Sequence, residues 1–291
     1  MSDPRHQIAY RPRQLILPQT GDDYAEPRDV IRPVALPDRM DYELVGPTPE
    51  DVERLFWFRW IAGHQVSFIL WRTIGDVLRS HSDNVPTPRQ LVALTACVDG
   101  YSAMLLYSAT VPRDHYHAQL RVRMATHHPS FSGSWASDYR PLRRLFRGRV
   151  RWFGKPSCAA LREAVELNRR THDHIADLLV PDGRSLLQMY AGSAEASVSQ
   201  EKEELFDSFF MVVRRPVSRA EVIAQLNSRV AEIATDLASN GFYPKIDGGH
   251  LPEVHDSAPD RMRALTTDVL RVLCNAALLA DEIGRPLEGV H

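Results

Sequence analysis

The stretch Leu55-Phe-Trp-Phe-Arg-Trp-Ile-Ala-Gly-His64-Gln65-Val-Ser-Phe-Ile-Leu-Trp71-Arg72 decides how this chain is interpreted. Here and in the next two turns, seven residues recur at spacings of three and four and so share one helical face: Trp57, Ile61, His64, Phe68, Trp71, Gly75 and Leu78. The pattern places His64 on an apolar face. A buried imidazole needs a polar partner because it loses its hydration. His64 is therefore either a core histidine bonded to a nearby carbonyl or a functional group.

The composition predicts a globular protein that works in the cytoplasm. With 291 residues, 44% of them hydrophobic and 25% charged, the chain is long enough to bury a sizeable core. A formal charge of −2 argues against nonspecific binding of nucleic acid. The first residues lack the order of a signal peptide, and the apolar runs are shorter than the ~18 residues that suggest a membrane span. Three cysteines, in no metal-binding spacing, suit free thiols in a reducing compartment.

Residues 1–46 are predicted to form an extended arm, and residues 47–291 one all-α domain. Six prolines interrupt the arm, which we expect to lie on a neighbouring subunit of a homodimer or larger homo-oligomer. The helix of His64 begins at Thr48-Pro49 and runs to about Ser80, because threonine caps a helix and proline suits its first turn. A second helix, from Thr87-Pro88, reaches Tyr107.

The second half of the chain also reads as helical. From Pro156 to Val180 one face carries Asn168 and His172, with His174 pointing away. That placement of His172 suits either a metal ligand or a satisfied core residue. A capping box at Ser218 starts a helix that ends at Asn240-Gly241, and a last helix runs from Pro259 to near Gly284. No useful stretch alternates with period two, so we expect no sheet.

Two charged or titratable clusters invite functional interpretations. Six arginines between Arg140 and Arg151 form either a solvated face or a set of forks that bind acidic groups. Four histidines lie within fourteen residues: His115, His117, His127 and His128. Their side chains diverge on a helix, so we expect no metal site there.

Three segments together resemble the tryptophan 2,3-dioxygenase superfamily over about residues 50–185. Gly-His64-Gln65, followed by an aromatic face and Arg72, is similar to the helix that carries the distal histidine of the dioxygenase. The segment from Arg121 to Phe131 resembles the part that binds the substrate carboxylate, and Leu167–His172 resembles the helix of the axial ligand. The dioxygenase loop that closes over the substrate amine is absent after His172. The chain is thus most similar to bacterial heme-dependent tyrosine hydroxylases of the same superfamily.

This resemblance implies a heme enzyme that hydroxylates L-tyrosine or a close derivative to a catechol, with peroxide or dioxygen, in natural-product biosynthesis. His172 would ligate the iron of heme b, with Trp57, Asn168 and Arg140 as further cofactor-binding residues. The heme would be noncovalent, because the His-x-x-x-Cys attachment motif of some relatives is absent from the chain. His64 would move protons on the open side of the heme.

On the same resemblance, either Arg121 or Arg123, with Ser130, would bind the substrate carboxylate, while Phe68 and Trp71 would cover the ring. Two alternatives stay open at this point. One is a ring-opening enzyme of the tryptophan dioxygenase type. The other is an all-helical binding or regulatory protein without catalytic activity, in which both histidines are core residues.

Overall fold

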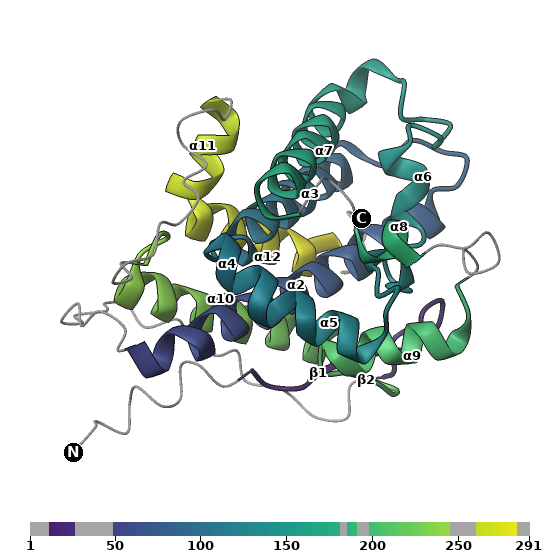
Figure 1. Cartoon of the computed structure of the whole chain (residues 1–291). Helices are drawn as coiled ribbons and strands as arrows, with labels where there is room; N and C mark the ends of the chain where they lie inside the picture. Colours follow the sequence, from purple (N-terminus) through teal and green to yellow (C-terminus); the bar gives the residue numbers. More distant parts are fainter. Residues whose placement is uncertain (1–11, 27–48, 181–184, 191–197, 245–259, 284–291) are drawn as a thin grey trace.

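Helices dominate the chain, as the sequence predicts (Figure 1). The computed structural model describes residues 12–26, 49–180, 185–190, 198–244 and 260–283. The helices are α2 (Pro49–Ser80), α3 (Pro88–Ser108), α4 (Arg113–His115), α5 (Arg121–His127), α6 (Leu142–Phe146), α7 (Ala159–Leu179), α8 (Leu186–Tyr190), α9 (Gln200–Phe209), α10 (Arg219–Asn240), α11 (Asp260–Thr267) and α12 (Val269–Ile283). A π-helical segment, Tyr116–Leu120, joins α4 to α5. Short 3₁₀ turns, Gly133–Trp135 and Pro156–Cys158, precede α6 and α7.

Helix α3 is the centre of the bundle. It packs against α2, α7 and α12, and α10 closes the bundle by packing on α2 and α12. By length and composition α3 could span a membrane, which corrects the expectation that no apolar run reaches that length. However, 78% of its apolar window is buried inside the fold, as in the core helix of a bundle. Gly63 lets α2 approach α3 closely, since a Cβ there would lie 2.1 Å from Ser108 Oγ.

Local capping chemistry sets several helix boundaries as predicted. Thr87 and Gln90 form the capping box of α3, and Ser218 and Glu221 form that of α10. Helix α10 ends at Gly241, which has a φ of 69° that favours glycine. The expected last helix is instead two, α11 and α12, which meet at residue 268.

The all-α fold carries one small sheet, in which two strands of three residues pair in parallel. β1 (Leu15–Leu17) lies beside β2 (Val212–Arg214), with Leu15 opposite Val212. Both leucines at the ends of β1 are fully buried in the main core. The described part of the arm therefore packs on its own chain, whereas we had expected it on a neighbouring subunit. The boundary at residue 46 falls outside the described residues and stays a prediction.

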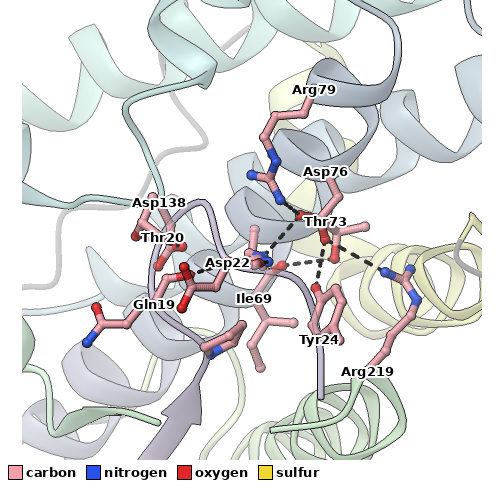
Figure 2. A network of polar contacts seen from close by, with 12 residues as sticks. Gln19, Thr20, Asp22, Tyr24, Ile69, Thr73, Asp76, Arg79, Asp138 and Arg219 are labelled. Atoms are coloured by element: carbon pink, nitrogen blue, oxygen red, sulfur yellow. Dashed lines mark hydrogen bonds and ion pairs between the residues drawn. The ribbon is translucent and has the colours of Figure 1, made fainter. Parts of the chain in front are cut away.

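A polar network on α2 fastens the segment that follows β1 (Figure 2). Asp76 accepts a hydrogen bond from Tyr24 at 2.7 Å and forms ion pairs with the guanidinium groups of Arg72, Arg79 and Arg219. Arg72 also donates to the carbonyl of Gln19 at 2.9 Å. The segment that follows β1 is thus tied to the helix that carries His64.

Candidate active site

His64 lies on α2 with one ring nitrogen engaged. Its Nδ1 is 2.6 Å from the carbonyl oxygen of Trp60, one turn earlier. A carbonyl only accepts, so Nδ1 carries the proton and donates it, which leaves the lone pair of the neutral ring on Nε2. No hydrogen bond to Nε2 is found within the part of the chain that the structure describes. Burial lowers the pKa of His64 to about 4, against a smaller opposing effect of the Trp60 bond.

Two aromatic rings pack against the His64 imidazole. The Phe210 ring stacks on it at 4.4 Å between centroids and 17° between planes, and the Trp60 ring lies at 4.5 Å. The indole Nε1 of Trp60 is buried and has no hydrogen-bond partner among the described residues. An unpaired donor and an unpaired acceptor thus belong to neighbouring rings. The Trp60 donor is buried, and buried donors ordinarily find partners, whereas His64 is half-buried.

The π-helical segment connects this pair of rings to the rest of the site. Tyr116, in its first turn, lies 5.9 Å from the Trp60 ring. Burial raises the pKa of the Tyr116 phenol, and a hydrogen bond with Arg121 opposes that shift. His117, the next residue, hydrogen-bonds to the backbone of Leu179 at the end of α7. π-Helical turns are rare and often occur at functional sites, so the segment marks this junction as a candidate site.

The two candidate carboxylate-binding arginines have different surroundings. Arg121 contacts Tyr116 and donates to the sulfur of Met189 at 3.1 Å. Arg123 is exposed, and its guanidinium lies 4.8 Å from the centroid of the Trp57 ring. Only Arg121 is therefore linked through a direct neighbour to the rings around His64.

The predicted substrate residues Ser130, Phe68 and Trp71 are all buried, and their roles stay predictions. Ser130 is fully buried, with both its amide and its hydroxyl 3.1 Å from His128 Nδ1. Phe68 lies 5.8 Å from the Phe210 ring and 5.3 Å from that of Trp71. Trp71 points on into a second group of rings, those of Tyr101 and Tyr139. Neither Ser130 nor Trp71 makes a ring contact or hydrogen bond with His64 in the described residues.

Two further residues predicted to hold the cofactor contact other groups. Trp57 packs against Phe209 at 5.6 Å, at the edge of the same aromatic cluster as Phe210. Arg140 forms an ion pair with Glu203 of α9. Arg140 thus binds an acidic group of its own chain.

The predicted burial of His172 is wrong. The face of α7 that packs inward includes Leu167, Asn168 and Thr171, whereas His172 is exposed. Asn168 uses its amide to donate to Ser102 Oγ of α3 at 2.9 Å, so it holds two helices together. His174, predicted to point away, is half-buried, and its Nε2 is buried without a partner among the described residues. The role of His172 as iron ligand stays untested, but His172 lacks the burial on which that prediction rested.

The sequence interpretation missed the aromatic residues of α9. Phe206, Phe209 and Phe210 are all buried and pack against Phe131 and Phe68. The adjacent pair Phe209-Phe210 at a helix end was the available signal. Two consecutive rings point about 100° apart, so both can be buried only where the chain packs on two sides of the helix end. Met211 follows with a φ of 59°, a backbone conformation that is uncommon for residues other than glycine.

Comparison with known proteins places this arrangement in a family. The family model described as SfmD 3-methyl-L-tyrosine peroxygenase matches residues 6–168, more than half of the chain. The matched part contains β1, α2, α3, the π-helical segment and the start of α7 as far as Asn168. No curated protein matches the chain. The predicted resemblance to enzymes that act on tyrosine is confirmed at the level of the family: this chain belongs to the SfmD 3-methyl-L-tyrosine peroxygenase family.

Proposed function

We propose that this chain is a heme-dependent peroxygenase that hydroxylates the aromatic ring of tyrosine or a methylated tyrosine. The observation that carries the proposal is the neutral His64 ring, fixed by Trp60 and Phe210, inside the part of the chain that matches a peroxygenase family. Such a ring can accept a proton at a defined atom. A phenol beside an aromatic surface is a matching substrate, because its ring is apolar and its hydroxyl both donates and accepts.

In this proposal the phenol hydroxyl lies at the ring edges that carry His64 Nε2 and Trp60 Nε1. It donates a hydrogen bond to His64 Nε2 and accepts one from Trp60 Nε1, so both unpaired groups gain a partner. The hydrogen bond to His64 polarises the phenol O–H and raises the electron density of the ring carbons next to the hydroxyl. Those carbons are the positions at which a catechol forms. Trp60→Phe removes the donor but keeps a ring, and it should weaken substrate binding with little change in folding.

Arg121 is the better candidate for the substrate carboxylate, because it contacts Tyr116, whose ring lies near Trp60. A charge-assisted bond to a guanidinium is worth enough that Arg121→Gln should raise KM by roughly 10- to 100-fold. Arg123→Gln is the matched control, two residues away on the same helix. A larger rise of KM in Arg123→Gln would reverse the assignment.

The donor chemistry of α7 fits a heme, although with a different residue from the predicted one. A heme needs a neutral imidazole as ligand on one side of its iron, and when bound it supplies the iron that activates peroxide. His174 has a buried ring nitrogen without a partner, as a ligand would in the absence of its metal. We propose His174 in place of His172 for this role. No cluster of three or more His, Cys, Asp or Glu competes for a metal ion in the described residues.

Spectroscopy separates the two histidines without any assay of turnover. The protein is titrated with hemin, and the Soret band is followed in His174→Ala and His172→Ala. We expect loss of stable binding in His174→Ala alone. Loss in His172→Ala alone would return the ligand role to the exposed residue.

Product analysis tests the reaction itself. Heme-loaded protein is given peroxide with L-tyrosine, 3-methyl-L-tyrosine or L-tryptophan, and products are identified by mass spectrometry. A gain of one oxygen atom on a tyrosine substrate is expected. Opening of the indole ring of tryptophan would favour the dioxygenase alternative. A protein that binds no hemin and changes none of these substrates would contradict the proposal and favour a binding or regulatory role.

A further inference from the structure

Gln65, the neighbour of His64 on α2, is fully buried and makes three polar contacts that its amide can satisfy in only one orientation. Its Oε1 accepts from Arg229 Nε at 2.7 Å. Its Nε2 donates to the carbonyl of Arg13 at 2.8 Å and to that of Phe210 at 2.9 Å. A guanidinium only donates, so Arg229 fixes which end of the amide faces the two carbonyls.

Arg229 is itself held firmly in place. It is 3% exposed, it forms an ion pair with Glu232 at 3.0 Å, and it donates to the backbone carbonyls of Arg13 and Gln14. A buried arginine with this many partners has little freedom to move. Gln65 is therefore fixed from one side by a rigid group and can hold the Phe210 carbonyl on the other.

The backbone around Phe210 is constrained at both ends. Phe210 follows the last residue of α9, and its amide donates to the carbonyl of Phe206. The next residue, Met211, has a φ of 59°, and its carbonyl accepts from Leu15 of β1 at 3.0 Å. A left-handed non-glycine residue persists where the surroundings determine it. With the backbone held in this way, the Phe210 ring stacks on the face of His64.

We propose that Gln65 and Arg229 are positioning residues, which hold the Phe210 ring on His64 and so fix the direction of His64 Nε2. The inference rests on the proposed role of His64 as the proton acceptor. Neither residue touches the substrate in this scheme. They act through the Phe210 backbone, and without them the ring can shift among its aromatic neighbours and admit more water to the imidazole.

The proposal predicts a change in the proton affinity of His64. Only burial and the Trp60 bond shift the pKa of His64, with no contribution from a charged side chain. Gln65→Met removes both donors at similar length and introduces no charge. If Phe210 then moves away, solvation of the imidazole should raise the pKa of His64 from about 4 toward 6.5, by roughly one unit or more.

Gln225 of α10 provides a matched control, because it bonds to the same arm. Its side chain also bridges the backbone, accepting from the amide of Ile16 at 2.8 Å and donating to its carbonyl at 2.9 Å, but it does not contact Phe210. Gln225→Met therefore loosens β1 without releasing the ring. The pKa of His64 should be the same in this variant as in the unaltered chain.

The experiment is an NMR titration of the full chain, in which the His64 signal is identified by its loss in His64→Leu. A raised pKa in Gln65→Met with an unchanged one in Gln225→Met supports the proposal. Equal values in all three proteins, or equal rises in both variants, overturn it. If Gln65→Met does not fold, Arg229→Lys keeps the charge but loses the Nε–H donor, and the same rise is required. Because the titration needs neither heme nor substrate, a failure of the proposed reaction leaves this result interpretable.

Discussion

Acidification should destabilise the fold through His64. Its pKa is about 4 in the folded chain against 6.5 for the free side chain, so between these values the unfolded state binds the extra proton. The contribution of the neutral His64 imidazole to the free energy of unfolding is fully present above pH 6.5. It is lost as the pH falls toward 4. The whole shift corresponds to about 3 kcal/mol, of which about 2 kcal/mol is lost between pH 7 and pH 5.

Urea unfolding at the two pH values measures this loss. The free energy of unfolding of the unaltered chain should fall more between pH 7 and pH 5 than that of His64→Leu, by about 2 kcal/mol. Val66→Ala is the control, since it removes buried apolar atoms two residues away but no titrating group, and its loss should be equal at both pH values. If His64→Leu loses as much stability on acidification as the unaltered chain, the imidazole is not held neutral by burial.

Three further predictions concern stability. Asp236→Asn should lower the free energy of unfolding by about 3–5 kcal/mol in urea melts. The reason is that the buried guanidinium of Arg59, which lies 2.8 Å from the Asp236 carboxylate, would lose its counter-ion. A loss as small as that of a surface ion pair would contradict this. Gly63→Ala should lower the free energy of unfolding by about 1–3 kcal/mol, because the added methyl group forces α2 away from α3. Adding Ser108→Ala should recover part of that loss in the double variant. Strictly additive effects of the two changes would place the strain elsewhere. Met211→Gly should raise Tm, with a gain of about 0.5–1 kcal/mol from relief of the positive φ, while Met211→Ala should not.

Features that depend on neighbours in sequence were predictable. The capping boxes at Thr87 and Ser218 involve residues three apart, so the starts of α3 and α10 follow from local chemistry. His64 was found for the same reason, since its periodic face and its Trp60 partner lie on one helix. The strands were not predictable, because three residues carry no period and β1 is stabilised by a segment near residue 212.

The error at His172 has a different origin. From Asn168, a buried stripe can continue through either Thr171 or His172, since both lie about one turn further on. The sequence favoured the histidine because threonine reads as polar. In the structure the Thr171 hydroxyl donates to the carbonyl of Leu167 within its own helix at 2.9 Å, so threonine can be buried at little cost. Which of the two residues is buried depends on where α3 packs against α7, and the local sequence of α7 does not contain that information.

The π-helical segment Tyr116–Leu120 has a consequence for how relatives of this chain are compared. A π turn accommodates one residue more than an α turn, so it is the natural product of a single insertion. Each residue of an α-helix turns the chain by about 100°. A homologue with one residue deleted here would form an ordinary helix and present a different side chain to Tyr116 in the place that Arg121 occupies. On the substrate-binding role proposed for Arg121, a one-residue gap in an alignment at this segment marks a change in the residue that faces the substrate carboxylate.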